Sequence, residues 1–411
     1  MWIYIFLFLL QLGDLVQIQL IGQMSLSEIV FMLWFVFNVL TGKQAVLLRD
    51  GNIRKLTMLY GWLFFFQLIS EIMVGNEFSN AAKGLAVTVL SYVKFTCLWS
   101  VVRKDGRLLI FLFLFTALAR LFNMELEDEG VDVADILKGT AYVFFKFKVA
   151  PLIGMLLVVM SLLKKNVKMS LAFIVVGGIC IVLGARSTGL MIFLTGAIVY
   201  AIEHMRHMSR QKVIVWSAAG AILCYGVFVM YVTAVLNGSI ISGNSSEQIA
   251  KLKEPYNPVN VLLAGRKESA SSLAAISDRP LTGFGAWAPD PGYKYHMIIA
   301  ESHEEEFNIA RMGTNVIPSH SVILGSGVNN GIFAMFAMTL ILWFFIKNGT
   351  RALYKGNEYN YLIVFCVMQL AWNGLFSPVG HFRGFFPIYF CCCLYAYERY
   401  VLLKKLKCNV S

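Results

Sequence analysis

The chain has 411 residues, of which 58% are hydrophobic and only 14% charged, and its mean hydropathy is +0.67. A soluble domain is about half apolar and a quarter charged, so this composition excludes an ordinary soluble protein and indicates an integral membrane protein. The formal net charge of +11 comes from scattered basic residues with no basic stripe interleaved with aromatics, which argues against nucleic-acid binding.

Apolar runs long enough to cross a hydrocarbon core of about 30 Å follow one another along most of the chain. The opening MWIYIFLFLL has no basic start and no cleavage site, so it is predicted to be a membrane segment rather than a removed signal peptide. Gly13, Asp14, Gln17 and Gln19 dilute this first run, and eleven spans remain if it does not cross. The twelve expected spans are 2–22, 26–42, 56–75, 85–102, 107–122, 140–163, 169–184, 188–202, 213–236, 321–346, 360–376 and 384–402.

The loops between these spans alternate in charge. Six of them, at 43–55, 103–107, 164–168, 203–212, 347–358 and 399–407, hold 20 Lys and Arg, whereas the alternate short loops hold 5. Because basic loops stay in the cytoplasm, both termini are predicted to be cytoplasmic.

A polar stretch of 82 residues, 237–318, interrupts the apolar pattern on the outer side. A loop of this length in a compact fold is usually functional. We therefore expect an all-α polytopic membrane protein with about twelve transmembrane helices and one large periplasmic loop. Its expected parts are transmembrane helices 1–9 in 1–236, the loop in 237–320, and transmembrane helices 10–12 in 321–411.

Seven of the eight cysteines lie in apolar segments, and the last, Cys408, lies in the basic tail. No pair lies in a polar loop, and none has the spacing of metal ligands. This pattern argues against a disulfide framework and against a zinc site.

Four cations lie in or beside the expected spans. Arg186, in the turn GARSTG, is either an interfacial side chain that reaches for water or a clamp for phosphate, since its planar fork matches phosphate oxygens. Lys146 and Lys148 lie about two turns inside a span, and Arg120 lies near the outer end of the preceding one. Residues two apart do not share a helix face, so we expect at most one of the lysines to face inward with Arg120.

The outer loop carries Arg266 and then Arg279, which precedes the turn Pro280-Leu281-Thr282-Gly283-Phe284-Gly285. Proline fixes one backbone dihedral, and Gly283 and Gly285 permit positive φ or close backbone approach. This turn is therefore predicted to fold tightly against a ligand or against another loop. Such a turn by itself is a weak signal, because other extracellular turns look similar.

His320 lies where the loop re-enters the membrane, a position in which a proton acceptor can meet a hydroxyl group. His381 and Arg383 form a similar pair between the last two expected spans. The alternative for each of these side chains is a structural role, as a hydrogen-bonded anchor at the membrane interface. Taken together, the outward cations favour metal-independent handling of an anionic, lipid-borne substrate, because no Asp-rich metal motif accompanies them.

These features resemble the O-antigen polymerase and O-antigen ligase superfamily, whose members share this length, topology and large periplasmic loop. Ser321 replaces the family's usual Asn, and no Trp follows Arg266 at the customary spacing. The motifs span only about 30 positions of the chain. The counterparts of the family's motifs are Ala185-Arg186-Ser187, Arg266, Pro280 to Gly285, His320-Ser321, and Gly331-Ile332-Phe333.

The resemblance implies a membrane glycosyltransferase C-like fold in the bacterial inner membrane and a role in lipopolysaccharide biosynthesis. It implies a glycan donor carried on undecaprenyl diphosphate, with Arg186 and Arg266 holding the diphosphate as it leaves and His320 orienting or deprotonating the acceptor hydroxyl. Arg279, Arg120, Lys146, Lys148, His381, Arg383, Gly283 and Gly285 are the expected substrate-binding residues. No cofactor is expected, and a polysaccharide chain-length regulator is an expected partner.

Three functions remain open. A polymerase adds the growing chain to a new lipid-linked repeat unit. We favour it because polymerases are the members that vary most in sequence, and this chain departs from the family at two motif positions. A ligase transfers the finished polymer to lipid A core. A flippase or transporter also has many spans and intramembrane cations, but usually shows internal repeats or paired broken helices and seldom has so long an outer loop.

Overall fold

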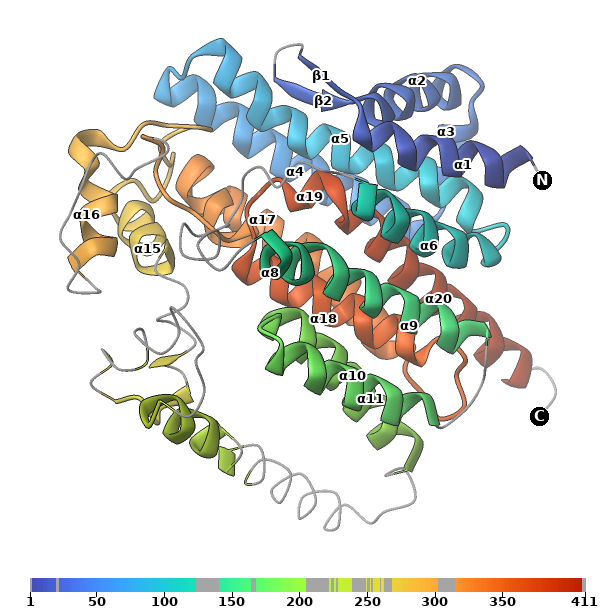
Figure 1. The fold of residues 1–411 in the computed structure, drawn as a ribbon. Helices are drawn as coiled ribbons and strands as arrows, with labels where there is room; N and C mark the ends of the chain where they lie inside the picture. Colours follow the sequence, from blue (N-terminus) through green and yellow to red (C-terminus); the bar gives the residue numbers. More distant parts are fainter. Residues whose placement is uncertain are drawn as a thin grey trace.

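The structure is a computed structural model that describes residues 2–19, 22–122, 140–163, 168–204, 222, 225–226, 228–238, 249, 252, 254–258, 260–261, 268–301 and 315–408. The long helices form a bundle, and a smaller layer lies across one end of it (Figure 1). We call residues 268–301 and 315–320, which make up this layer, the lid. Both chain termini lie at the opposite end of the bundle (Figure 1). Their assignment to the cytoplasm stays a prediction.

Helices make up most of the described chain. The lid contains α15 (Glu268–Asp278), the 3-10 turn η4 (Pro291–Tyr293) and α16 (Lys294–Glu301). The bundle contains α1 (Trp2–Leu12), α2 (Leu26–Leu40), α3 (Lys43–Leu48), α4 (Gly51–Val74), α5 (Phe78–Val102), α6 (Arg107–Phe122), α8 (Thr140–Phe144), the π-helical η2 (Phe145–Val149), α9 (Ala150–Leu163), α10 (Lys168–Val182), α11 (Arg186–His204), α17 (Val322–Arg351), α18 (Asn360–Phe376), α19 (His381–Gly384) and α20 (Phe386–Cys408).

Within the described residues, five helical segments are long and apolar enough to cross a membrane. They are Gly51–Val74, Phe78–Val102, Tyr142–Leu163, Arg186–His204 and Val322–Arg351. Other apolar helices, such as α10 and α18, are shorter, and the expected span 213–236 lies largely outside the described residues. The prediction of a helical protein with several candidate membrane spans is thus confirmed, whereas the number twelve stays a prediction.

The structure corrects the first expected span, because residues 2–22 do not form one helix. Helix α1 ends at Leu12, and the 3-10 turn η1 (Gly13–Leu15) follows it. The chain then forms an antiparallel hairpin of β1 (Gln17–Gln19) and β2 (Gln23–Ser25). With 11 residues, α1 extends only about 16 Å, roughly half of a hydrocarbon core.

A part-buried polar cluster lies where α1 ends. The Asp14 carboxylate accepts a hydrogen bond from the Ser25 hydroxyl at 3.2 Å and another from the Ser27 hydroxyl. The ammonium group of Lys94, a residue of α5 that is only 5% exposed, lies 3.9 Å from Asp14. The same ammonium lies 5.7 Å from the centre of the Phe31 ring. A charged side chain in an apolar bundle requires a partner of opposite charge. Asp14 and Lys94 are such partners for each other, and the hairpin brings them together.

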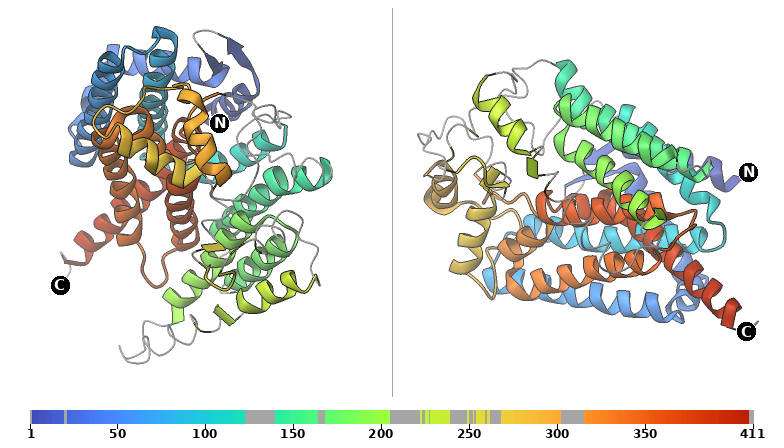
Figure 2. Two further views of the ribbon diagram at one scale, coloured as in Figure 1. Left: turned by 90° about the vertical axis from the view of Figure 1, so that its left-hand side faces the viewer. Right: turned by 90° about the horizontal axis from the view of Figure 1, so that it is seen from below.

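Helices α5, α17 and α20 pack together in an aromatic core at the centre of the bundle (Figure 2). The rings of Phe345 and Phe390 stack with their centroids 3.9 Å apart, and Phe95 meets Phe345 edge-on at 5.5 Å. All three side chains are fully buried. This core fixes the course of α17, whose first turns lie under the lid.

Helix α17 is broken at Gly331, where φ is 79° and ψ is 179°. A break of this kind leaves nearby backbone N–H and C=O groups without their hydrogen-bond partners in the helix. When these groups are buried, they need hydrogen-bond partners from elsewhere in the protein. The carbonyl oxygens of Val328 and Asn329 accept hydrogen bonds from the N–H groups of Phe284 and Gly285, at 2.9 and 2.8 Å. The turn predicted to fold tightly therefore takes the place of the next helical turn.

The contact between the turn and α17 is made by backbone against backbone. The Ile332 N–H donates to the carbonyl of Pro280 at 2.7 Å, so the hydrogen bonds run in both directions. A Cβ atom on Gly331 would collide with the carbonyl of Leu281, and one on Gly283 would lie 2.6 Å from the carbonyl of Asn329. Both glycines are thus required by close approach as well as by positive φ.

The lid has a small hydrophobic core of its own, which lies against the first half of α17. Tyr295, from α16, is its largest side chain and meets Phe284 of the turn edge-on at 5.5 Å. The buried members of this core are Ala275, Ile276, Ala288, Tyr295, Ile317 and Val328. The lid therefore rests on the bundle through apolar packing in addition to the backbone hydrogen bonds of the turn.

We predict that Gly283→Ala weakens the docking of the turn far more than Gly292→Ala does. Gly292 has nearly the same φ, 63° against 64°, but no atom lies within 4 Å of its Cβ position. Gly292→Ala should therefore cost only the backbone strain, about 1–2 kcal/mol. Gly283→Ala adds the collision with Asn329, for about 1–3 kcal/mol more.

Hydrogen exchange of residues 279–286 in the purified protein measures this difference. The expected result is fast exchange in Gly283→Ala and near-native protection in Gly292→Ala. Equal protection in the two variants would show that the turn does not depend on close backbone contact with α17.

Candidate functional site

A buried carboxylate anchors the lid to the end of α4 that lies nearest to it. The Glu71 carboxylate, on a residue that is 4% exposed, accepts hydrogen bonds from the Ala286 N–H at 2.9 Å and from the Asn330 amide at 3.1 Å. Its second oxygen accepts from the Asn76 amide at 2.6 Å, and the same amide donates to the Ala286 carbonyl at 2.9 Å. Glu71 thus joins α4, the turn and α17 at one point.

The structure places three predicted substrate-binding residues in this anchored turn. Gly283 lies against the backbone of Asn329, and the Cβ position of Gly285 is 2.8 Å from the Asn76 amide. The Arg279 guanidinium lies 4.7 Å from the centre of the Phe284 ring, and its residue is exposed. The contacts of the two glycines are with protein, and Arg279 presents its charge at the surface of the lid. Substrate binding by these three residues stays a prediction.

His320 lies at the junction of the lid and α17, beside a carboxylate from α15. Its Nδ1 is 3.7 Å from a carboxylate oxygen of Glu268, and both side chains are about a third exposed, 34% and 29%. This distance is longer than a hydrogen bond, which for N–H and O is about 2.7–3.2 Å. When Nδ1–H faces the carboxylate, the free lone pair of the ring is on Nε2, where it can accept a proton.

Ser321, the residue after His320, has a structural role. Its hydroxyl caps α17 by accepting from the Leu324 N–H at 3.0 Å, and it donates to the Gly374 carbonyl of α18 at 3.1 Å. Asn and Ser are both good helix caps, so Ser321 can replace the family's Asn at this position. The cap holds the start of α17 against α18 and thereby fixes the backbone that carries His320.

Among the described residues, three serine hydroxyls of the lid and of α17 are buried without a hydrogen-bond partner: those of Ser271, Ser319 and Ser326. Ser319 contacts α17, since the Cβ position of Gly325 lies 2.6 Å from its hydroxyl, and the hydroxyl of Ser272 reaches the Pro318 carbonyl at 3.4 Å. Buried hydroxyls are normally bonded. The contact region of α15 and α17 therefore holds hydroxyl groups without a partner among the described residues.

Arg186 begins α11, in a helical hairpin whose turn lies toward the lid end of the bundle (Figure 1). Its guanidinium lies 5.7 Å from the centre of the Tyr231 ring. The hairpin of α10 and α11 is held by close backbone contact, because Cβ positions on Gly177 and Gly189 would each lie 2.8 Å from the other residue's carbonyl oxygen. Arg186 is thus presented from a closely packed helix pair.

Lys146 and Lys148 lie in the π-helical turn η2, which adds one residue to the continuous helix formed by α8 and α9. Both lysines are half-buried, and the Lys146 ammonium lies 4.8 Å from the centre of the Phe147 ring. Single π-helical turns are often found at functional sites. The side chain of Arg120, near the end of α6, lies outside the described residues, so its predicted pairing with a lysine stays untested.

Arg383 has protein partners at the lid side of α19. Its Nε lies 3.5 Å from the Glu28 carboxylate, and its Nη2 donates to the Gln23 carbonyl at 3.2 Å. These contacts tie α19 to the hairpin and to the start of α2. His381, on the same short helix, is half-buried and lies 6.1 Å from the Phe385 ring. The predicted substrate-binding role of both residues stays a prediction.

A second polar network stiffens the lid away from His320. Lys294 and Tyr295 donate hydrogen bonds to the Asp278 carboxylate, at 2.5 and 2.6 Å. The bond from Lys294, followed by that from Tyr295, holds the pKa of Asp278 below its ordinary value, while burial and the Asp278 contact raise the pKa of Tyr295. The buried Asp290 carboxylate accepts from His296 Nδ1 at 2.6 Å. These bonds link α15 to α16.

The structure brings together only part of the predicted site. His320 and the turn 280–285 both contact the first half of α17, whereas Arg186 lies on a different helix pair. Arg266 lies outside the described residues, two positions before Glu268 in the sequence. Sequence reasoning missed Glu268 and Glu71. For Glu71 a signal existed, because it is an acid close to the end of an apolar segment, whereas nothing in the local sequence distinguishes Glu268.

Within the part of the chain that the structure describes, no three His, Cys, Asp or Glu side chains are grouped as ligands for a metal ion. Among comparisons with known proteins, no family model matches the chain, and no curated protein matches it either. The features that bear on function are therefore the motif residues and the geometry around His320.

We predict that Glu71→Gln loosens the lid. Both carboxylate oxygens of Glu71 accept hydrogen bonds from N–H groups, and in the variant an NH₂ group takes the place of one oxygen and faces an N–H donor. Leaving a buried amide or N–H without its acceptor costs about 1–3 kcal/mol. Hydrogen exchange of residues 279–286 should quicken in Glu71→Gln. The matched control is Glu77→Gln, which removes an exposed charge six residues along the chain. Native protection in Glu71→Gln would mean that the carboxylate does not anchor the turn.

Proposed function

We propose that this chain is a membrane glycosyltransferase that joins saccharide repeat units carried on undecaprenyl diphosphate, as an O-antigen polymerase does. In this proposal about twelve helices cross the bacterial inner membrane in a membrane glycosyltransferase C-like arrangement, the lid is periplasmic, and both termini are cytoplasmic. The observation that carries the proposal is the His320–Glu268 pair at the lid end of α17. His320 directly precedes Ser321, which caps α17, and α17 is the helix that receives the turn 280–285.

The pair supplies what the acceptor half of the reaction needs. The Nε2 of His320 takes the proton of the acceptor hydroxyl while that oxygen forms a bond to the anomeric carbon. The Glu268 carboxylate faces Nδ1 and stabilises the imidazolium that results. The 3.7 Å separation is in keeping with such a pair, since catalytic hydrogen bonds are often long before substrate binds.

The cations supply what the donor half needs. The bond between the anomeric carbon and the phosphate oxygen breaks, and the lipid diphosphate leaves with the electron pair. Arg186 and Arg266 would hold this group, since guanidinium matches phosphate oxygens and stabilises charge as it develops. Arg279 on the lid and Lys146 and Lys148 on η2 are further cations for the anionic donor.

The position of the pair suits a substrate that is half sugar and half lipid. His320 lies where the polar lid meets an apolar bundle, so a glycan reaches it from water and a polyprenyl chain from the bilayer. In the proposal the apolar side chains of α6, with the sequence RLLIFLFLFTALARLF, line the path of the polyprenyl chain. The anchored turn then holds the lid in place over the reacting atoms.

The first test uses cells that depend on this protein for their surface polysaccharide. His320→Ala and Arg266→Ala should abolish long-chain polysaccharide while the protein level stays the same. Loss of a general base usually lowers a rate by a factor of about 10²–10⁴. Glu268→Gln, which keeps the shape but not the charge, should give an intermediate loss. Gel profiles of surface polysaccharide, together with immunoblots, measure both quantities.

The matched control is His204→Ala. His204 is exposed near the end of α11, and its Nδ1 lies 2.9 Å from the Tyr200 carbonyl on the same helix. Normal polysaccharide in His320→Ala or Arg266→Ala, at unchanged protein level, would refute the assignment of these residues. A loss in His204→Ala equal to that in His320→Ala would show that any histidine substitution disturbs the protein.

A deletion strain separates polymerase from the alternatives. One repeat unit on the core means polymerase, whereas no repeats with accumulated lipid-linked polymer means ligase. Loss of repeats with intermediates held in the inner leaflet means flippase. The proposal expects the first of these profiles.

We also predict that the activity of the purified protein survives EDTA. Guanidinium groups in the proposal stabilise the leaving diphosphate without a metal ion. The measurement is the transfer of repeat units between lipid carriers, with and without the chelator. Loss of activity with EDTA and recovery with a divalent cation would argue for a metal-dependent reaction.

A further inference from the structure

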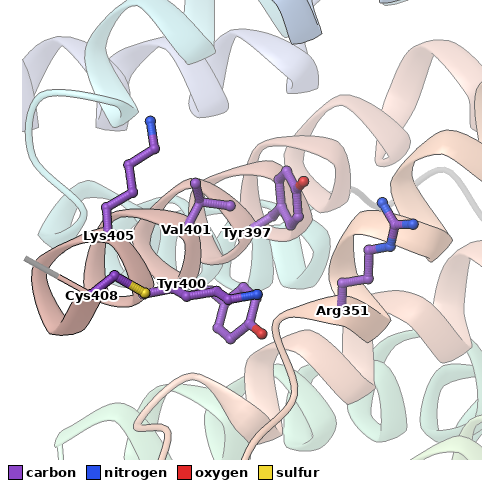
Figure 3. Close-up of a pocket in the computed structure, with 7 residues that line it drawn as sticks. Arg351, Tyr397, Tyr400, Val401, Lys405 and Cys408 are labelled. Atoms are coloured by element: carbon purple, nitrogen blue, oxygen red, sulfur yellow. The ribbon is translucent and has the colours of Figure 1, made fainter. Parts of the chain in front are cut away.

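A hollow lies at the end of the bundle opposite the lid, between the last turns of α17 and α20 (Figure 3). Its volume of about 640 Å³ falls within the range of small-molecule sites, roughly 300–1,000 Å³. Arg351, the last residue of α17, forms one wall. The other lining residues all come from α20: Tyr397, Tyr400, Val401, Lys404, Lys405 and Cys408.

The residues from α20 form one face of the helix, because their positions are three or four apart. The Tyr400 side chain points toward Arg351, whereas the ammonium group of Lys405 points away from Arg351 (Figure 3). Three of the lining side chains are cations, and no acid lines the hollow. Within the described residues the nearby acid Glu358 pairs instead with Arg399, at 2.9 Å. The hollow therefore has the charge and the hydrogen-bond donors that a phosphate requires.

The opposite face of the last turns of α20, beyond Arg399, carries exposed leucines. With about 3.6 residues per turn, Leu402 and Leu406 lie on the side away from Lys404. These two leucines are 57% and 54% exposed, and Leu403 is 38% exposed. Helix α20 projects past its neighbours at this end (Figure 2). The exposed leucines suit contact with acyl chains, while the cations lie at the level of headgroups. A free phosphate ion would make no use of the leucines.

We propose that this hollow binds the phosphate of an anionic phospholipid in the leaflet on the side opposite the lid. The Arg351 guanidinium and the Lys404 ammonium group neutralise the phosphate, Lys405 adds positive charge beside them, and Tyr400 offers a hydroxyl donor. Basic pockets between transmembrane helices bind acidic headgroups in this way. The site is separate from His320 and independent of the proposed glycosyl transfer.

Native mass spectrometry of the purified full-length protein tests this site with dioleoylphosphatidylglycerol as the probe and dioleoylphosphatidylcholine as the neutral comparison. The wild type should retain phosphatidylglycerol in preference to phosphatidylcholine. In Arg351→Gln/Lys404→Gln/Lys405→Gln the affinity for phosphatidylglycerol should fall by a factor on the order of 100, since each basic residue contributes roughly fivefold. The double variant Lys404→Arg/Lys405→Arg keeps the charges and should retain the lipid.

The matched control removes three charges at the same end of the bundle but outside the hollow: Lys43→Gln/Arg49→Gln/Lys55→Gln. It should retain phosphatidylglycerol as the wild type does. An equal loss in this control, or no loss in the triple variant of the hollow, would overturn the proposal. Displacement of the lipid by millimolar inorganic phosphate would also overturn it, because the site would then be one for a free ion. If the triple variant does not fold, Arg351→Gln alone should lower the affinity about fivefold.

Discussion

The hydrogen bonding of α17 around Gly331 is the constraint on which the lid end of this protein depends. A broken helix in an apolar bundle leaves carbonyl groups that no water reaches, and each needs a donor. The N–H groups of Phe284 and Gly285 supply these donors from a loop segment, and Glu71 fixes the far side of the same turn. The lid and the helix that follows His320 are consequently one structural unit. His320 keeps its place because both of its neighbours in the chain are held.

Most of the helices could be predicted from apolar runs, because length and composition alone decide which segments leave water. The first run was the exception. Residues 2–22 looked apolar on average, but Asp14 has its partner in Lys94, about 80 positions further along the chain. A local average cannot anticipate a pairing at that distance. No local pattern indicated the β-hairpin of residues 17–19 and 23–25. Its two short strands stabilise each other by pairing.

The candidate site could be predicted only where neighbouring residues in the sequence determine the local structure. Proline and two glycines in 280–285 indicated a tight turn, and His320 was recognisable at the mouth of a helix. The contact of that turn with the backbone around Gly331, and the closeness of Glu268 to His320, are set by tertiary packing, which no local pattern predicts. Lys94 shows the same limit: a single lysine within an apolar helix became meaningful only once Asp14 was placed beside it.

The glycine contacts between α10 and α11 have a consequence for access to the bundle. Backbones that touch at Gly177 and Gly189 leave no layer of side chains that can slide or repack between the two helices. The two helices are therefore expected to behave as one rigid unit, which joins the bundle through α9 and α18. Any displacement of α11 would carry the charge of Arg186 with it and would draw α10 along.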